Sequence, residues 1–345
     1  MKEGTEVRGT NRHRLISITA ALLTISAMSA SAHHSPAAFD LANQITIQGK
    51  VSRFDWTNPH AYIYVSTTTS GRPTEWMIET DGTSLLTRSG WSRGILSVGS
   101  VVTVRANPDR DAGKSHALLI SMALANGTVL TPRSNGTDGA SQATSLAGVW
   151  NGLRGFAARK VGPIRPTPKG LAAVKGFTVA ANPVTGCMPY ATPFLTSLPY
   201  LNEIDVQKDR ILIRNEFLNV DRTVFMDGRG HPKDGSRTTQ GHSIGKMDGN
   251  VLVVDTTLFS DHRLGNYLGS GAGPRELPSG PQKHVVERYR LSEDRTRLLI
   301  DIVVEDPDYL IEPLTMGMEW DYTPKLRLLR FGCEPEQSRR YLSLQ

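Results

Sequence analysis

The feature that most constrains the fold is a series of short alternating segments joined by tight polar turns in the second half of the chain. Turns such as Asp248-Gly249 separate these segments, and Asp-Gly between two alternating runs is the strongest short-range signal for a β-hairpin. Sequential antiparallel strands with short turns close most easily into an up-and-down barrel. We therefore expect a calycin-like up-and-down β-barrel, with a β-sandwich as the alternative. The expected strands lie near 202–207, 210–217, 221–226, 242–247, 250–257, 283–291, 297–304 and 315–322.

A different order of elements is predicted for the first half. Three strands come first, then a short helix, then two more strands, and this is the order of an OB-like five-stranded barrel. Gly49 interrupts the first strand, where a glycine usually marks a bulge or a sharp bend. The predicted strands are 44–54, 61–69, 74–80, 100–106 and 115–124, with the helix at 82–90.

The two halves are separated by residues 131–146, which contain almost nothing that a core could bury and are a linker by composition. This divides the chain into an OB-like domain at 33–130 and a calycin-like domain at 147–345. The second domain begins with a strand at Gly148-Val149-Trp150, and a short helix begins at Thr167-Pro168. The Gly- and Pro-rich loop 258–281 is a candidate lid over the barrel mouth. The whole fold is therefore expected to be all-β.

The N-terminus has the pattern of a signal peptide covering residues 1–32. A basic stretch ends at Arg14, an apolar run follows, and Ala30-x-Ala32 is the small-x-small pattern of a cleavage site before His33. The alternative is an anchor that is never cut. No later segment reaches the roughly 20 apolar residues that a membrane span needs. The expected location is periplasmic or secreted.

Composition adds two constraints. The net charge of +6 falls to about +4 once residues 1–32 are removed, and the remaining charge forms no basic run, so no nucleic-acid role is expected. Cys187 and Cys333 are the two cysteines of the chain, and an even count in an oxidising compartment favours a disulfide over two buried thiols.

Several motifs resemble those of an uncharacterised family of exported bacterial proteins. In the first half they are His33-His34-Ser35, Phe39-Asp40, Trp56-Thr57-Asn58-Pro59-His60 and Gly90-Trp91. In the second half they are Met226-Asp227-Gly228-Arg229, Gly241-His242-Ser243 and Val253-Val254-Asp255-Thr256. The resemblance implies export and a second β-rich domain, and it implies no activity.

The new N-terminus is the first candidate site. Cleavage before His33 would leave an α-amine beside an imidazole, and these two groups can chelate one copper ion. His34 or His60 would supply a third nitrogen, with His116 as a further candidate. The alternative interpretation is that these are exposed histidines near a frayed terminus.

The interior of the second barrel is the second candidate site. Asp255 shares strand parity with Val251 and Val253, and His242 shares it with Ile244. Inward-facing imidazole, carboxylate and guanidinium groups would form a general acid/base site, although a one-residue slip would turn them all outward. The predicted catalytic residues are His242, His284, Asp255 and Arg222, and the predicted substrate-binding residues are His231, Asn215, Tyr267 and Tyr289.

No phosphate-binding glycine loop, Gly-x-Ser-x-Gly elbow, His-Glu-x-x-His or Cys-x-x-Cys motif occurs in the sequence. The leading hypothesis is a barrel that binds a small hydrophobic or aromatic molecule without a cofactor and acts on it as a lyase, isomerase or cyclase. One alternative is a copper-binding protein that uses His33. The other is a non-catalytic interaction module of the cell envelope.

Overall fold

The computed structural model describes Met1 and residues 38–69, 71–133, 141–158, 160–266 and 277–339. Apart from Met1, the predicted signal peptide therefore lies outside the described residues. Beyond residue 31 the described chain forms one unit by its internal contacts, and it contains two separate β-sheets. The predicted domain boundaries at 131–146 remain a prediction.

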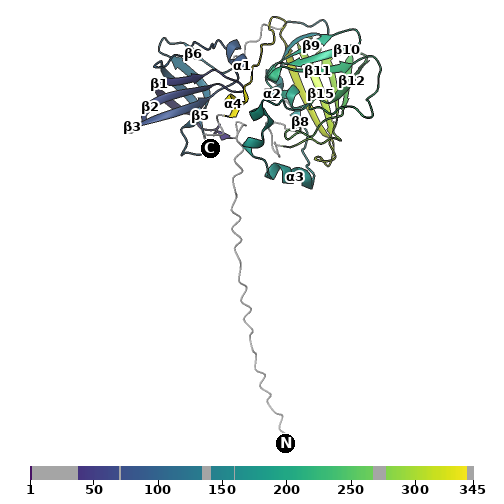
Figure 1. Ribbon diagram of the computed structural model, residues 1–345, viewed down its shortest axis with the longest axis horizontal. Coiled ribbons are helices and arrows are strands. Elements are labelled where there is room, and N and C mark those ends of the chain that lie inside the picture. The colour runs from purple at the N-terminus through teal and green to yellow at the C-terminus, as the bar shows by residue number, and fades with distance from the viewer. Residues whose placement is uncertain (2–37, 70, 134–140, 159, 267–276, 340–345) are drawn as a thin grey trace. The chain divides into compact units, whose positions relative to one another are not determined.

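The first sheet closes into a five-stranded barrel of the OB type, drawn in purple and blue in Figure 1. Around the described barrel the strand order is β3-β2-β1-β4-β5, and a parallel pairing of β3 with β5 closes the ring. The elements are β1 (Ile45–Asp55), β2 (Tyr62–Thr69), β3 (Arg72–Glu79), α1 (Thr83–Arg88), β4 (Val101–Pro108), β5 (His116–Leu124) and the short β6 (Val129–Leu130). The predicted OB-like architecture is confirmed.

Gly49 is explained by a close backbone approach. A Cβ atom at Gly49 would lie 2.4 Å from the backbone oxygen of Ser66, so any side chain would push β2 away from β1. The register shift of β1 comes later, between Val51 and Arg53. The glycine therefore permits tight strand packing, and the irregularity follows it by two residues.

The second sheet closes into a barrel of nine described strands, drawn from teal to yellow in Figure 1. The ring order is β7-β9-β10-β11-β12-β13-β14-β15-β16, closed by pairing of β16 with β7. The strands are β7 (Gly148–Asn151), β9 (Leu201–Val206), β10 (Arg210–Asn215), β11 (Val220–Phe225), β12 (His242–Asp248), β13 (Val251–Thr257), β14 (His284–Leu291), β15 (Arg297–Glu305) and β16 (Leu314–Tyr322). The all-β, calycin-like prediction is confirmed.

One pairing in this barrel departs from the up-and-down pattern. β11 and β12 run parallel, with Val224 opposite Ser243 and Phe225 opposite Ile244. The polar turn that begins at Asp227 is therefore the start of a longer crossover, 226–241, and does not form a hairpin. Parallel neighbours cannot be joined by a tight turn, because the chain must return to the same end of the sheet.

Short elements fill the connection between β7 and β9. They are α2 (Leu153–Ala158), β8 (Lys160–Val161), which pairs with β16, α3 (Pro168–Lys175), η2 (Val179–Ala181), η3 (Pro183–Gly186) and η4 (Leu195–Ser197). Two further short helices are η5 (Phe217–Asn219) and α4 (Pro335–Arg339). α3 begins as predicted, because the Thr167 hydroxyl accepts a hydrogen bond from the Gly170 amide at 3.1 Å.

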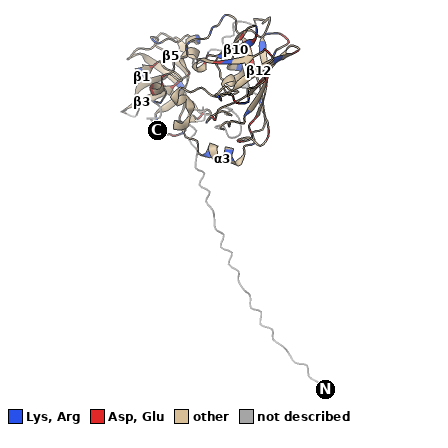
Figure 2. Cartoon of the chain, turned by 45° about the vertical axis from the view of Figure 1, so that its right-hand side comes forward, with Lys and Arg blue, Asp and Glu red and all other residues tan. Residues whose placement is uncertain are grey.

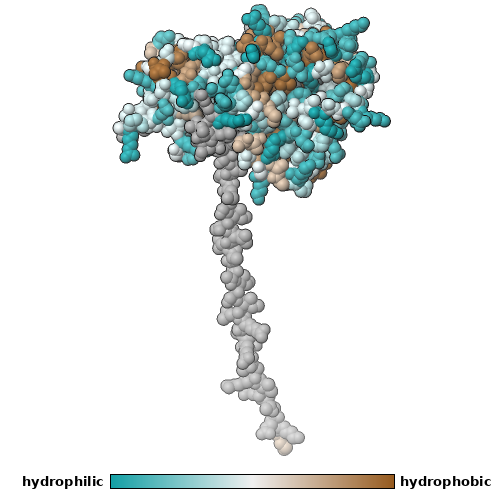
Figure 3. Space-filling model, viewed as in Figure 1, coloured by the Kyte–Doolittle hydropathy of each residue, from teal (hydrophilic) through white to brown (hydrophobic). Residues whose placement is uncertain are grey.

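Each barrel has its own buried core, and the second core is filled by large side chains. Trp150, Phe259, Tyr289 and Trp320 are all fully buried in the C-terminal barrel. Figure 2 shows Lys, Arg, Asp and Glu interspersed along the strands and loops of both barrels. On the face drawn in Figure 3, hydrophobic residues gather in small areas within a largely hydrophilic surface.

Candidate functional site

Burial shows which face of each strand points into the C-terminal barrel. On β13 the fully buried residues are Leu252, Val254 and Thr256, and on β14 they include Val285 and Tyr289. Asp255 and His284 have the opposite parity and lie on the outer face. The predicted inward orientation of Asp255 and His284 is therefore wrong. Both parities of β13 carry valines, so the apolar pattern did not distinguish its two faces.

The predicted catalytic set is split by this geometry. His242 also has outward parity, because its neighbour Ser243 is the buried residue at the start of β12. Arg222 points inward, as predicted, and is 5% exposed. The proposed meeting of Arg222 with the two histidines and Asp255 in one hollow does not occur.

Inside the barrel Arg222 belongs to a different polar network. Its Nε donates to the Ser243 hydroxyl at 2.9 Å, and its Nη2 donates to the Thr256 hydroxyl at 2.8 Å and to the Glu287 carboxylate. The Tyr289 hydroxyl donates to the other carboxylate oxygen of Glu287 at 2.8 Å. These groups satisfy one another in the interior, which is what a buried ion pair requires for stability.

The remaining predicted residues form a row on the outer face. The carboxylate oxygen Oδ1 of Asp255 lies 3.1 Å from Nε2 of His231 and 3.0 Å from Nε2 of His284. Nδ1 of His231 lies 2.9 Å from Nδ1 of His242, and Nδ1 of His284 lies 3.0 Å from Glu305. Three of the four predicted catalytic residues thus gather with His231, although not inside the barrel.

Hydrogen-bond roles in this row follow from the partners. His284 faces a carboxylate with each ring nitrogen, an arrangement that favours the protonated ring. Partial burial lowers the pKa of His284, but the contacts with Glu305 and Asp255 outweigh burial and raise it overall. Burial and the neighbouring His231 lower the pKa of His242. The surroundings therefore shift the pKa values of His284 and His242 in opposite directions.

Other predicted residues have separate places. Asn215 is buried and donates to the side chain of Asn202 at 2.6 Å, away from the Arg222 network. His33, His34 and Tyr267 lie outside the described residues. Cys187 and Cys333 form the predicted disulfide, with Cα atoms 5.9 Å apart.

His60 and His116, both candidate copper ligands, are joined by carboxylates in the N-terminal barrel. Glu79 bridges them, at 2.8 Å from Nδ1 of His60 and 3.4 Å from Nε2 of His116. His116 also contacts Asp109 at 3.1 Å. Burial opposes charge on both imidazoles, but the carboxylates raise the pKa of each. Within the described chain, no group of three or more His, Cys, Asp or Glu residues is arranged to hold a metal ion. Copper binding by the N-terminus stays a prediction.

A cavity of about 130 Å³ lies where loops of the two barrels meet. Five aromatic side chains line it, and all come from irregular segments or short helices of the second half. They are Phe156, Tyr190, Phe194, Tyr200 and Phe217. Several of these rings contact one another, including Tyr190 and Phe217, whose stacked ring centroids are 5.7 Å apart. An aromatic wall of this kind favours a flat apolar ligand.

The cavity lining also contains polar and charged residues. Its charged residues are His60, Asp81 and Arg133, from loops of the N-terminal barrel and the segment that follows it. Arg133 donates two hydrogen bonds to the Asp81 carboxylate, at 2.5 Å and 2.6 Å, and its guanidinium lies 5.2 Å from the ring centroid of Phe156. Burial and the charge of Asp81 raise the pKa of the Tyr200 hydroxyl, which keeps it protonated.

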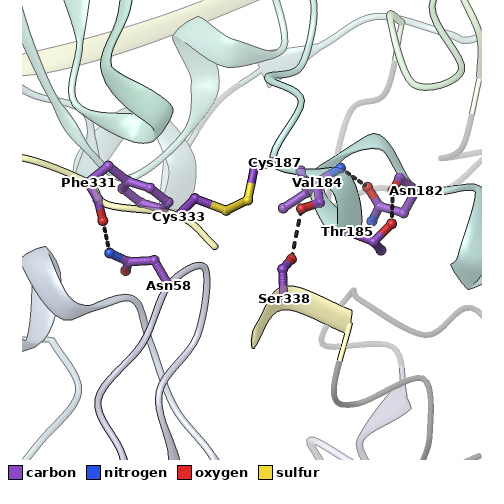
Figure 4. Close-up of a disulfide and its surroundings, with 8 residues drawn as sticks. All are labelled: Asn58, Asn182, Val184, Thr185, Cys187, Phe331, Cys333 and Ser338. Carbon is purple, nitrogen blue, oxygen red and sulfur yellow. Dashed lines mark hydrogen bonds between the residues drawn. A yellow bond between two sulfur atoms is a disulfide. The ribbon is translucent and has the colours of Figure 1, made fainter. Parts of the chain in front are cut away.

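The disulfide lies close in the sequence to residues that line this cavity, and Figure 4 shows it together with Val184, Thr185 and Ser338. Cys187 follows η3, whose Val184 and Thr185 line the cavity, and Cys333 precedes α4, whose Ser338 lines it too. The Ser338 hydroxyl donates to the Val184 carbonyl at 2.8 Å, and the Asn58 amide donates to the Phe331 carbonyl. The covalent bond and these hydrogen bonds together join segments that are distant in the sequence.

Of the cavity residues, the sequence interpretation singled out only His60, as a candidate copper ligand, and it missed the others. The one signal was the segment 188–200, which is rich in proline and aromatic residues but lacks the alternation of its neighbours. Such an apolar segment without strand periodicity must be buried against something other than a sheet ladder. Asp81 and Arg133 carried no comparable signal, because they are single charged residues near a turn and a linker.

No helix of the described chain is long and apolar enough to cross a membrane.

Comparison with known proteins connects only part of the chain to a family. Residues 20–119 match a family of unknown function, DUF6152, which covers most of the N-terminal barrel. No curated protein sequence matches the chain. A crystal structure of a mutant of the fluorescent protein UnaG matches with a TM-score of 0.23 and 10% identity, over 52% of this chain and 96% of that chain.

Proposed function

We propose that this chain binds a small, flat, largely apolar molecule in the aromatic cavity. The observation that carries the proposal is a cavity of about 130 Å³ lined by five aromatic rings and by the side chains of His60, Asp81 and Arg133. An apolar cavity of about 150 Å³ in a protein core holds one benzene molecule. A ligand the size of a single ring therefore suits this site.

The proposal moves the expected ligand site from the barrel interior to the cavity beside it. Trp150, Tyr289 and Trp320 occupy the interior side of the barrel wall, where the sequence interpretation placed the ligand. The ligand class is the one expected from the sequence, an aromatic or apolar molecule. The disulfide favours an oxidising compartment for the protein, in line with the proposed export.

The test is a binding measurement with a neutral single-ring probe. We expect 4-fluorobenzamide to show 19F line broadening and a saturable dissociation constant with the purified protein. Val184 lines the cavity, so Val184→Phe should fill the site and weaken binding about tenfold or more. Val206→Phe is the matched control, because Val206 is 52% exposed on β9.

Thermal unfolding of both variants checks that each is folded. Loss of binding in Val184→Phe with retention in Val206→Phe supports the cavity as the site. Equal binding by wild type and both variants would place the probe elsewhere and overturn the proposal, as would the absence of binding to the wild type.

A further inference from the structure

The Tyr200 side chain brings a hydroxyl without a protein partner to the aromatic cavity. Tyr200 lines the cavity and is only 5% exposed. Its backbone carbonyl accepts hydrogen bonds from the Gly152 amide and the Asn202 side chain, but its hydroxyl makes none with any residue that the structure describes. A buried tyrosine hydroxyl usually has a hydrogen-bond partner. This hydroxyl is therefore available to a ligand.

Packing on both sides fixes the position of the hydroxyl. The Tyr200 ring contacts Phe217 and Phe331, with ring centroids 5.1 Å and 5.6 Å away. A Cβ atom at Gly82 would lie 3.0 Å from the hydroxyl oxygen, so the oxygen lies beside the backbone that follows Asp81. Burial and the charge of Asp81 raise the pKa of the hydroxyl. The group therefore stays protonated and can donate a hydrogen bond.

Arg133 supplies further unused donors near this hydroxyl. Its Nε and Nη2 each donate to one oxygen of the Asp81 carboxylate. Its Nη1 makes no hydrogen bond within the described part of the chain. A guanidinium can only donate, and a protonated tyrosine hydroxyl has one proton to donate. The unused polar capacity of Tyr200 and Arg133 is thus suited to an acceptor atom.

The charged side chains near the cavity are balanced in pairs. The pairs are Arg133 with Asp81, His60 with Glu79, and Arg88 with Glu216. An ionic ligand would lose its hydration and find no unpaired charge of opposite sign. A neutral ligand avoids this cost, so the acceptor atom should belong to a neutral group.

We propose that the ligand of this cavity is a neutral aromatic carbonyl compound whose carbonyl oxygen accepts a hydrogen bond from the Tyr200 hydroxyl. The inference rests on the proposed function, since it needs the cavity to hold a ligand. A carbonyl group conjugated to a ring lies in the plane of the ring and keeps the molecule flat. Its oxygen has two lone pairs and can accept from Tyr200 and Arg133 together.

The experiment compares two probes of the same shape, 4-fluoroacetophenone and 4-fluoro-α-methylstyrene, in which a methylene group replaces the carbonyl oxygen. Their dissociation constants are measured by 19F NMR. Tyr200→Phe keeps the ring and removes the hydroxyl. It should weaken acetophenone binding about fivefold or more and change styrene binding less than about twofold. The ratio of the two changes isolates the hydrogen bond from the packing of the ring.

Tyr309→Phe is the matched control. Tyr309 packs partly buried against the core of the C-terminal barrel and is not among the described residues that line the cavity. This variant loses the same hydroxyl group at another place, so both probes should bind it as they bind the wild type. Thermal unfolding checks that both variants are folded.

The carbonyl carbon of the bound acetophenone reports the hydrogen bond directly. With 13C at this position, the resonance of the probe bound to the wild type should lie downfield of its position in cyclohexane, because hydrogen bonding withdraws electron density from the carbon. The bound resonance should move upfield in Tyr200→Phe. A wild-type resonance at the cyclohexane position would overturn the inference, even if Tyr200→Phe does not fold.

The outcomes separate the two proposals. If neither these probes nor 4-fluorobenzamide binds the wild type, the proposed function fails, and this inference fails with it. If both probes bind and Tyr200→Phe changes their affinities equally, the cavity binds ligands but Tyr200 does not select a carbonyl oxygen. This inference alone is then overturned.

Discussion

The two faces of the C-terminal barrel wall carry polar clusters of opposite character on the same strands. On the inner face of β11 to β14, Arg222 and Glu287 form a fully buried ion pair with hydroxyl partners. On the outer face, Asp255 lies between His231 and His284, and its side chain is 40% exposed. The inner cluster is shielded from water, whereas the outer one is open to it.

Burial, more than residue type, sets how much a polar cluster contributes to the free energy of unfolding. Water screens the outer row, so its pairs contribute little to stability. Removing one partner of the inner pair would leave a charge with neither water nor a counterion. Removing a charged residue from a strand is therefore expected to cost much stability on the inner face and little on the outer face.

The largest effect should come from breaking the inner pair. Arg222→Met leaves Glu287 buried without its cation and should lower the free energy of unfolding by about 3–5 kcal/mol, measured by urea denaturation. Arg214→Met is the matched control on the outer face of β10, where Arg214 pairs with Glu203 and Asp205 in solvent. For Arg214→Met we expect the free energy of unfolding to fall by less than about 1 kcal/mol.

A double variant sharpens this result. Arg222→Met combined with Glu287→Leu removes both charges and should be more stable than Arg222→Met alone, because no unpaired charge remains. Equal losses for Arg222→Met and Arg214→Met would show that the two faces do not differ as described.

An intermediate effect is expected from a second buried cation. Lys283 is 1% exposed, and its amine donates to the backbone carbonyls of Thr192 and Gly265 at 2.6 Å and 2.7 Å. Burial lowers its pKa to about 7. Between pH 7 and the usual pKa of lysine, the unfolded chain binds more protons than the folded chain. Stability should therefore rise with pH in that window, by at most about 1.4 kcal/mol per pH unit.

Lys283→Met tests this by pH-dependent urea denaturation. The difference in unfolding free energy between wild type and variant should change with pH above about 7 and stay level below it. A difference that is constant up to about pH 10 would mean that Lys283 keeps an ordinary pKa.

The smallest effect belongs to the outer row. The pKa of His284 is raised in the folded state, so its contribution to stability is complete below its unfolded pKa and is lost as pH rises through the folded value. We expect wild type to exceed His284→Gln by less than about 1 kcal/mol near pH 5.5 and to match it near pH 8.5. A larger gap at high pH than at low pH would reverse the assigned charge state.

How far the sequence could predict the fold is clear from particular elements. The strand positions in both halves follow from alternation and from turns such as Asp248-Gly249, which are local properties. The parallel pairing of β11 with β12 could not be predicted, because the polar turn that begins at Asp227 resembles a hairpin turn locally. The face of β13 could not be predicted either, since Val251 to Val254 are apolar on both sides.

The candidate site was even harder to predict from local sequence patterns. The cavity brings His60 and Asp81 of the first half beside Tyr200 and Ser338 of the second. No local pattern marks such residues, because the contacts join positions separated by more than a hundred residues. The disulfide was the exception, since an even cysteine count is visible in the sequence itself.

Local sequence patterns predicted the β-strands of each barrel, and the even cysteine count favoured the pairing of Cys187 with Cys333. The choice of which alternate residues face the interior, and of which loops meet to form the aromatic cavity, followed from long-range packing. The physical reason is that strand periodicity and turn chemistry act between near neighbours, whereas burial depends on the closure of the barrels and on contacts between distant segments.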